Sequence, residues 1–347
     1  MNGPADPRSS ELAIADSLRR MGLVAAQDAV RLTALTGGVS SDIYRADLPS
    51  GPVCVKRALA RLKVAADWRA PPSRNRHEVG WLRFVAGIAP QAVPPVLAED
   101  ETGLAFAMPY LPPEQYPVWK AELRDGRIDP TFAAQVGRVL LAIHAASADR
   151  ADLALRFATD TDFHAIRLEP YLLATAARHP RLASRLRALL DTTAGTRRVL
   201  VHGDVSPKNI LCGPQGPVML DAECAWFGDP AFDLAFCLNH LLLKAVWRPE
   251  HRATYLQCFQ QLCDAYLGAV AWEPSEQLEA RTAVLLPGLM LARIDGKSPV
   301  EYIRSESNRE LVRRFATDKI LEPGRKLASI AHDWRATLDA QRPDPEQ

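Results

Sequence analysis

The sequence predicts an α+β protein with two lobes, a small β-rich N-terminal lobe and a larger, mainly helical C-terminal lobe. In the first third of the chain, short apolar segments alternate with Gly and Pro turn signals, a pattern typical of strands. Later segments are longer and carry apolar residues at helical spacing. A proline-rich stretch, 109–113, separates the two patterns. We therefore expect an N-lobe over residues 1–111 and a C-lobe over residues 112–347.

The elements of both lobes follow from apolar periodicity and turn signals. Spacings of three and four predict helices, and short runs bounded by Gly or Pro predict strands. In the N-lobe we expect a helix over 9–21, strands over 30–35, 41–47 and 53–58, a helix over 75–86 and a strand over 103–108. In the C-lobe we expect helices over 131–147, 171–191, 231–246 and 255–270, with one short β-rich patch over 199–221.

Composition narrows the function classes. The chain has 347 residues, 48% of them hydrophobic, with 42 Lys and Arg against 41 Asp and Glu, a net charge of +1. This balance gives no electrostatic reason to expect a nucleic-acid or membrane partner, and the charge pattern does not address oligomeric state. The six cysteines lack metal-site spacing, so we expect reduced, buried thiols. The first ten residues lack a signal-peptide core, and no apolar run approaches the ~20 residues of a membrane span, so we expect a cytoplasmic protein.

The residues that carry chemistry follow two short apolar strands. One strand leads into the polar loop HGDVSPKN (202–209), and about ten residues later another ends in LDAE (220–223). Phosphoryl transfer requires a carboxylate directed at the incoming hydroxyl, oxygen ligands for Mg²⁺ and positive charge near the phosphates. We expect Asp204 to accept the hydroxyl proton and Asn209 and Asp221 to bind Mg²⁺ through oxygen.

Glu223 lies two residues beyond Asp221 on an extended segment, so both side chains point to the same side. We expect Glu223 to be an additional metal ligand or an acid just behind the ligands.

Three motifs in register, 202–209, 220–223 and WFGDPAFDLA (226–235), are together similar to the aminoglycoside phosphotransferase and choline kinase superfamily. The resemblance implies a protein-kinase-like fold, ATP and Mg²⁺ as cofactors, and a hydroxyl of a small molecule as the acceptor. It also implies that Asp233 braces the catalytic loop. Within the superfamily, the DxE metal motif and the proline-rich hinge look like those of methylthioribose kinases, whereas Ser206-Pro207 departs from their pattern.

The resemblance extends to nucleotide-binding residues of the N-lobe. Gly37, Gly38 and Ser40 lie in a turn that resembles the phosphate-covering loop, where glycine allows the backbone to approach a ligand closely. Lys56 matches the nucleotide-binding lysine of the third strand, and strand alternation turns it away from its valine neighbours. Glu78, on the next helix, is the carboxylate expected to orient Lys56.

The proline-rich stretch occupies the position of the adenine-binding hinge in the superfamily. Pro109 has a carbonyl that can accept from the adenine amino group, and Leu111 has an N–H that can donate to the ring. Elsewhere, His144 is expected to be a hydrogen-bonded core histidine. For Trp226 and Phe227, packing under the metal strand and covering the substrate remain equal alternatives.

Several functions share these motifs. The first is a metabolic kinase acting on a sugar, an amino alcohol or a related metabolite, with methylthioribose-like acceptors included. The alternatives are an aminoglycoside antibiotic phosphotransferase and a non-catalytic nucleotide-binding regulator. Many arginines in the last third of the chain favour a neutral or anionic acceptor over a polycation. A protein kinase is disfavoured because the segment after Asp221 leaves no room for an activation loop.

Overall fold

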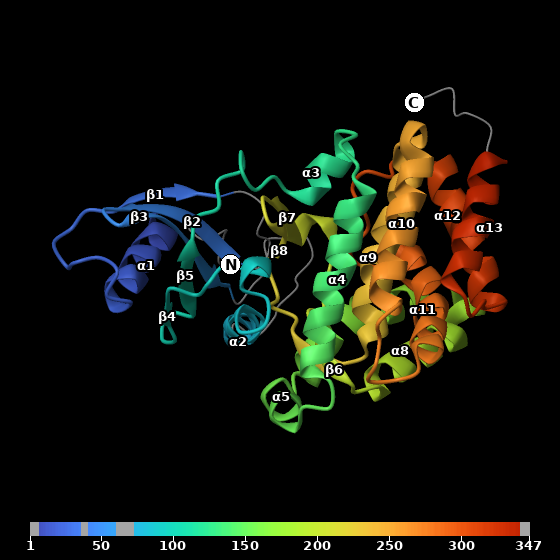
Figure 1. Ribbon diagram of the computed structural model, residues 1–347, viewed down its shortest axis with the longest axis horizontal. Helices are drawn as coiled ribbons and strands as arrows, with labels where there is room; N and C mark the ends of the chain where they lie inside the picture. The colour runs from blue at the N-terminus through green and yellow to red at the C-terminus, as the bar shows by residue number, and fades with distance from the viewer. Residues whose placement is uncertain (1–6, 36–40, 60–72, 341–347) are drawn as a thin grey trace.

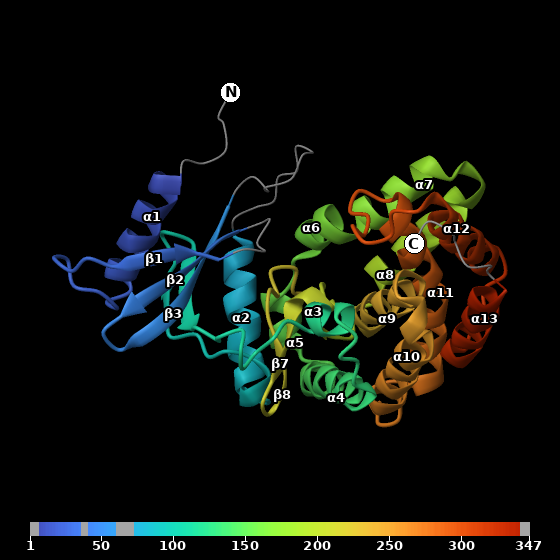
Figure 2. The ribbon, with the colours of Figure 1, turned by 90° about the horizontal axis from the view of Figure 1, so that it is seen from above.

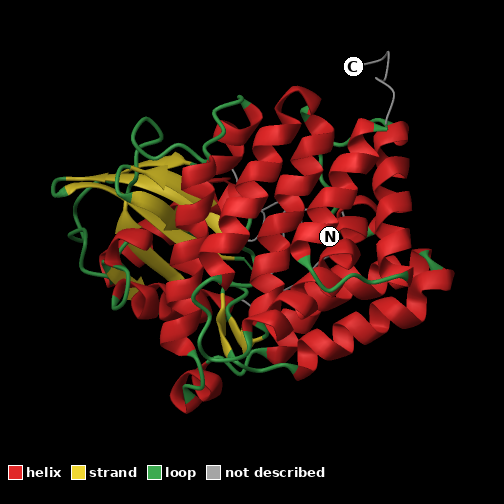
Figure 3. Cartoon of the chain, turned by 45° about the vertical axis from the view of Figure 1, so that its right-hand side comes forward, coloured by secondary structure: helices red, strands yellow, loops and turns green. Residues whose placement is uncertain are grey.

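The computed structural model describes residues 7–35, 41–59 and 73–340. The strands of the larger sheet gather at one end of the molecule and the long helices at the other (Figures 1 and 3). Below, the N-lobe denotes this sheet with α1 and α2, and the C-lobe denotes the described residues that follow Pro109.

Five antiparallel strands form the sheet of the N-lobe, in the order β1-β2-β3-β5-β4. They are β1 (Arg31–Ala34), β2 (Ser41–Leu48), β3 (Gly51–Ala58), β4 (Ala98–Asp100) and β5 (Ala105–Pro109). Four of them match the predicted strands within a few residues. The three-residue strand β4 was not predicted, because so short a segment carries no readable alternation.

The two faces of the sheet pack against different partners. Alternate residues of β3 and β5 point to opposite faces. One face joins α1 (Pro7–Arg20) in a small core that contains Val53, Val55 and Ala107. The other face joins α2 (Arg74–Ala86) and the C-lobe in the main core through Cys54, Phe106 and Met108. In Figure 2, α2 lies between the sheet and the C-lobe. Lys56 therefore extends from the face of the sheet that is turned toward the C-lobe.

The C-lobe is built around one buried helix. Every residue of α9 from Pro230 to Val246 is buried, and α10 and α11 pack against it. Its helices are α3 (Trp119–Arg124), α4 (Pro130–Ser147), α5 (Ala151–Arg156), α6 (Asp160–Phe163), α7 (Ala174–Arg178), α8 (Ala183–Gly195), α9 (Pro230–Trp247), α10 (Arg252–Leu267), α11 (Ser275–Asp295), α12 (Glu306–Leu321) and α13 (Leu327–Asp339). Within the described ranges, no helix is long and apolar enough to cross a membrane.

The prediction of one continuous helix over 171–191 was wrong. A π-helical segment, His164–Leu173, leads into α7, and the helix ends before Pro180. Proline lacks the N–H of a helical hydrogen bond and its ring crowds the preceding turn, so the chain restarts as α8. The apolar periodicity continues across this break and conceals it.

The predicted β-rich patch is confirmed as two small sheets. Strand β6 (Val199–Val201) pairs with β9 (Trp226–Gly228), and β7 (Ile210–Gly213) pairs with β8 (Gly216–Met219). The loops that leave β6 and β8 contain the two polar motifs, and the sheets hold these loops together.

Candidate active site

The loop after β6 is braced from beneath by a buried carboxylate. Asp233 in α9 accepts hydrogen bonds from the backbone N–H of His202 at 2.7 Å and of Gly203 at 2.8 Å. His144 lies 3.3 Å from the same carboxylate, and its other ring nitrogen lies 2.7 Å from the Tyr266 hydroxyl. The predicted bracing by Asp233 and the predicted core position of His144 are both confirmed.

His202 shapes the loop as a neutral ring. Its Nδ1 accepts from the Asp204 N–H at 3.1 Å, so the ring proton lies on Nε2, which donates to the Leu220 carbonyl at 3.0 Å. Burial lowers the pKa of His202, although Asp233 and Asp204 oppose this. With both nitrogens engaged, His202 links the two motif loops.

Gly203 is required by the backbone. Its φ of +77° favours glycine, and a Cβ at this position would lie 2.6 Å from the Cys224 carbonyl oxygen. This close approach packs the loop after β6 against the loop after β8.

Two cations hold the carboxylate of Asp204. Its Oδ2 lies 2.9 Å from Nη2 of Arg167 and 3.1 Å from Nζ of Lys208. Burial alone would raise the pKa of Asp204, but Lys208 and Arg167 outweigh it, so the pKa lies below its ordinary value and the group is ionised. Both of these contacts fall on Oδ2. Arg167 also donates to the Gly203 carbonyl.

Asn209 connects the two motif loops. Its side-chain Nδ2 donates to the backbone carbonyl of Asp204 at 3.0 Å. Its backbone carbonyl accepts from the Leu220 N–H at 2.9 Å. Asp221 follows directly, with a left-handed φ of 68°, which is uncommon for a residue other than glycine and is typical of functional sites. The structure thus brings Asp204, Asn209 and Asp221 to one place.

Lys56 reaches this place from the N-lobe. Its ammonium lies 2.7 Å from Glu78 and also contacts the carboxylate of Asp221. Burial raises the pKa of Glu78, and Lys56 offsets only part of this rise. For Asp221, Lys56 and Lys208 outweigh the effect of burial and lower the pKa. The ion pair expected between Lys56 and Glu78 is present.

Glu223 lies near this group but is paired elsewhere. It accepts from Arg74 of α2 at 2.9 Å, and only 1% of the Arg74 side chain is exposed. Its role as a metal ligand stays a prediction. Trp226 packs in the core, 1% exposed and stacked on Phe163, so the packing alternative holds for this residue.

The other predicted nucleotide contacts are only partly described. Pro109 ends β5 opposite Val53, and Leu111 follows it, half-buried, in the segment that leads to the C-lobe. Their contacts with adenine stay predictions. Gly37, Gly38 and Ser40 lie outside the described residues.

The oxygen donors present suit Mg²⁺. Asn209 uses its amide nitrogen internally, which leaves Oδ1 for a ligand, and Asp221 offers the oxygen that does not face Lys56. Mg²⁺ prefers a few carboxylate or amide oxygens and completes its shell with water and phosphate oxygens. The described residues contain no group of three or more His, Cys, Asp or Glu side chains that could hold a metal ion. The residues fit Mg²⁺ bound together with a nucleotide.

In this structure a buried lysine of the sheet lobe contacts an acid of the catalytic loops, and the helical lobe braces those loops. This arrangement defines a kinase-like phosphotransferase. Residues 31–286 match the model of the phosphotransferase enzyme family (APH), and the chain belongs to this family.

Known relatives agree with this assignment. The chain is similar to a methylthioribose kinase of Geobacillus thermodenitrificans, with 26% identity over 227 residues, which is 57% of this chain and 56% of that enzyme. The matched region therefore spans only about half of the relative.

Solved structures share the fold. Amicoumacin kinase hAmiN gives a TM-score of 0.57 at 13% identity, covering 93% of this chain and 98% of that one. The choline kinase of Cryptosporidium parvum gives 0.54 at 12% identity, covering 93% of this chain and 99% of that one. At such low identity the likeness concerns the fold alone, and it confirms the predicted bilobal α+β architecture.

Proposed function

We propose that this protein transfers the γ-phosphoryl group of ATP to a hydroxyl of a small molecule, with the nucleotide held by residues 1–111 and the acceptor by residues 112–347. The observation that carries the proposal is the convergence of Asp204, Asn209 and Asp221 at the end of the Lys56 side chain. These are the groups that positioning, metal binding and charge neutralisation require.

Asp204 is the proposed base. In the reaction a new bond forms between the acceptor oxygen and the γ-phosphorus, the bond to the ADP oxygen breaks, and the hydroxyl proton passes to Asp204. Arg167 and Lys208 contact Oδ2 and keep this carboxylate ionised, the state in which it can accept the hydroxyl proton. A positioned base of this kind contributes about 10² to 10⁴ in rate.

Asn209 and Asp221 are the proposed Mg²⁺ ligands, with Glu223 as a further candidate. When bound, the metal neutralises charge on the phosphates. Lys56, oriented by Glu78, would add positive charge at the same phosphates. Amicoumacin kinase hAmiN, which shares the fold, was solved in complex with AMP-PNP and Ca²⁺, and this supports an adenine nucleotide with a divalent ion here.

The remaining nucleotide contacts are proposed from the resemblance. Gly37, Gly38 and Ser40 would cover the phosphates, while the Pro109 carbonyl and the Leu111 N–H would bind adenine.

An ADP-release assay tests the proposal directly. The purified chain is incubated with ATP and Mg²⁺ and a panel of alcohols that includes methylthioribose, other pentoses, homoserine, choline, ethanolamine and kanamycin-like compounds. We expect acceptor-dependent ADP release with at least one class of acceptor. Tight nucleotide binding without ADP release on any acceptor would favour the non-catalytic regulator instead.

A further inference from the structure

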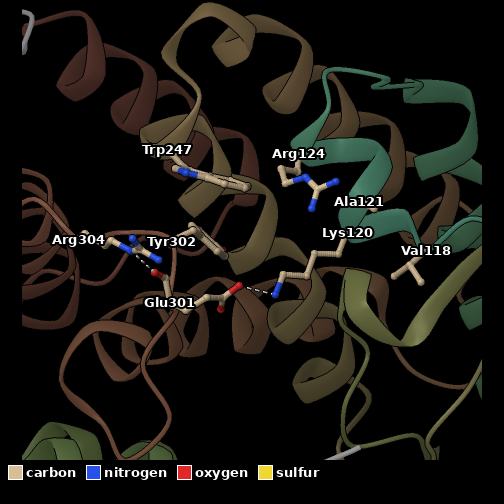
Figure 4. Close-up of a pocket in the computed structure, with 8 residues that line it drawn as sticks. All are labelled: Val118, Lys120, Ala121, Arg124, Trp247, Glu301, Tyr302 and Arg304. Atoms are coloured by element: carbon tan, nitrogen blue, oxygen red, sulfur yellow. Dashed lines mark hydrogen bonds and ion pairs between the residues drawn. The ribbon is translucent and has the colours of Figure 1, made fainter. Parts of the chain in front are cut away.

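A cavity of about 500 Å³ lies in the C-lobe between α3, the last turn of α9 and the segment 301–304 (Figure 4). Its charged lining is mostly basic, with Lys120, Arg124 and Arg304 against a single acid, Glu301. Lys120 is engaged with Glu301 at the exposed rim, as Figure 4 shows, and Arg124 is paired with its neighbour Asp125. The charges of the rim are therefore largely matched.

The cavity adjoins the catalytic loop. Val118 in its wall forms a β-bridge with Leu211 of β7, and the Cys212 N–H donates to the Pro117 carbonyl at 2.8 Å. Helix α3 also packs against the turn at Pro207–Asn209. The wall of the cavity and the loop that carries Asp204 are thus parts of one packed unit.

Helix α9 connects the two sites. It carries Asp233 beneath the catalytic loop and Trp247 in the cavity wall, with His240 between them. Burial lowers the pKa of His240 well below its ordinary value, and the charges of Arg293, Lys244, Lys208 and Lys120 add to this effect, so the ring is neutral.

A buried cation without an ion-pair partner among the described residues lies against two rings of the cavity wall. Lys244 is 1% exposed, and among the described residues its ammonium has no hydrogen bond and no ion pair. The ammonium lies 4.5 Å from the ring centre of Tyr302 and 5.3 Å from that of Trp247, two stacked rings that line the cavity. Burial, and then Lys120, lowers the pKa of Lys244 to about 7. The Tyr302 hydroxyl is also buried without a hydrogen-bond partner in the described structure.

A buried ammonium beside a buried, unpaired hydroxyl is costly unless a ligand completes both. We propose that the acceptor carries an anionic group, a carboxylate or a phosphate, that binds in this cavity to the Lys244 ammonium and the Tyr302 hydroxyl. The inference rests on the proposed function, because it assigns one end of the acceptor to this cavity and the reacting hydroxyl to Asp204.

A cationic acceptor fits the cavity less well. Stacked aromatic rings can bind a quaternary ammonium group. Here Lys244 already occupies the ring faces with the same charge, which would repel choline-like or polycationic acceptors. The cavity therefore favours hydroxy acids or phosphorylated alcohols.

Anion binding is tested on the full chain with Mg²⁺ and ADP present, so that the nucleotide site is filled. Thermal unfolding is followed in inorganic phosphate, in glycolate and in chloride at equal ionic strength, for the wild type, Lys244→Met and the control Lys326→Met. The control removes a half-exposed lysine that pairs with Glu279 outside the cavity. We expect phosphate or glycolate to raise the wild-type and control Tm by about 2 °C relative to chloride, and Lys244→Met to lose most of this rise. The more effective anion identifies phosphate or carboxylate as the group recognised.

The inference is overturned if neither anion raises the wild-type Tm, or if Lys244→Met keeps the full rise.

An activity assay distinguishes failure of this inference from failure of the proposed function. Three acceptors offer the same hydroxyl chemistry: glycerol carries no anion, glycerate carries a carboxylate, and glycerol 3-phosphate carries a phosphate. We expect Lys244→Met to lower any preference in kcat/KM for the anionic members by about 10- to 100-fold, as loss of a charged hydrogen bond would. ADP release on neutral acceptors without an anion effect would refute only the inference, whereas no ADP release on any acceptor would refute the kinase.

Discussion

The ammonium of Lys56 contacts the carboxylate of Asp221, although the two residues lie 165 positions apart. One belongs to the sheet of the N-lobe and the other follows β8 in the C-lobe. A second contact between the lobes, from Arg74 to Glu223, lies close to the first. These ion pairs close the space between the lobes at the point where we propose that the triphosphate binds, so nucleotide and metal would replace protein contacts rather than add to them.

Lys56→Met should impair both nucleotide binding and turnover. The change leaves Glu78 and Asp221 as buried acids without their shared cation and removes positive charge from the phosphates. We expect kcat/KM for ATP to fall by about 10²-fold or more, comparable to the loss of a stabilising charge contact at a reacting centre. Steady-state kinetics measures this fall. Lys297→Met, which removes an exposed lysine paired with Glu169, is the matched control and should behave as wild type. Near-normal kcat/KM in Lys56→Met would exclude Lys56 from the site.

Asp221→Ala should remove the effect of Mg²⁺ on nucleotide affinity. In the wild type, ATP should bind more tightly with Mg²⁺ than without it, because Asp221 and Asn209 would hold the metal and the metal would neutralise phosphate charge. Isothermal titration with and without Mg²⁺ compares the two proteins. A Mg²⁺ effect of wild-type size in Asp221→Ala would rule out this ligand assignment.

Glu223→Gln decides between two roles for Glu223. As a metal ligand, its loss should weaken the Mg²⁺ effect on ATP affinity. If Glu223 serves only to pair with Arg74, its loss should leave the Mg²⁺ effect intact. It should then lower the free energy of unfolding, because Arg74 is buried. The same titration, followed by urea unfolding, separates the two outcomes.

Asp233→Asn should loosen the catalytic loop. The carboxylate accepts from two buried N–H groups, and an amide can offer only one oxygen to them. Leaving one buried donor unsatisfied costs about 1–3 kcal/mol of unfolding free energy. Urea unfolding measures the loss. Asp152→Asn, at an exposed acid paired with Arg150, is the control. An unchanged unfolding free energy in Asp233→Asn would show that the brace contributes nothing to stability.

Lys244→Met should stabilise the protein without ligand, and the gain should depend on pH. The pKa of Lys244 is lowered to about 7 in the folded chain, whereas an unfolded lysine titrates near 10.4. Below pH 7 both states carry the charge, and the folded state bears the full cost of burying it. Between pH 7 and about 10 the folded state can lose the proton while the unfolded state keeps it, so the cost declines.

The gain in unfolding free energy from Lys244→Met should therefore be largest near pH 6.5 and much smaller near pH 9.5. Urea unfolding at the two pH values measures it. The charged groups that act on Lys244 are Lys120 from α3, Arg293 from α11 and Glu301, and all three remain in the variant. A loss of stability at pH 6.5 would mean that Lys244 serves packing alone.

The parts of the site that lie in contiguous motifs could be predicted from the sequence. The loop 202–209 and Asp221 each come just after a short strand, and the pairing of short strands brings such positions close together. The contact between Lys56 and Glu78 was predicted from the resemblance to the superfamily, in which an acid on the next helix orients the lysine of the third strand.

Contacts that depend on tertiary packing were not predictable. Arg167 lies in a π-helical segment that contains Pro170, and no local pattern relates it to the loop 36 residues later. Lys244 did carry a signal, as a lone lysine in the apolar run of α9, but periodicity alone cannot separate a buried cation from one that reaches solvent. The cavity itself forms only when α3, α9 and the segment 301–304 meet.

The most direct test of the account is the turnover of Asp204→Ala on an acceptor that the wild type phosphorylates, measured as ADP release beside the ATP affinity of the same protein. We predict a kcat lower by at least about 10²-fold with ATP still bound, because the base is removed and the nucleotide contacts remain. Full turnover by the correctly folded variant would contradict the assignment of Asp204 and the proposed mechanism with it.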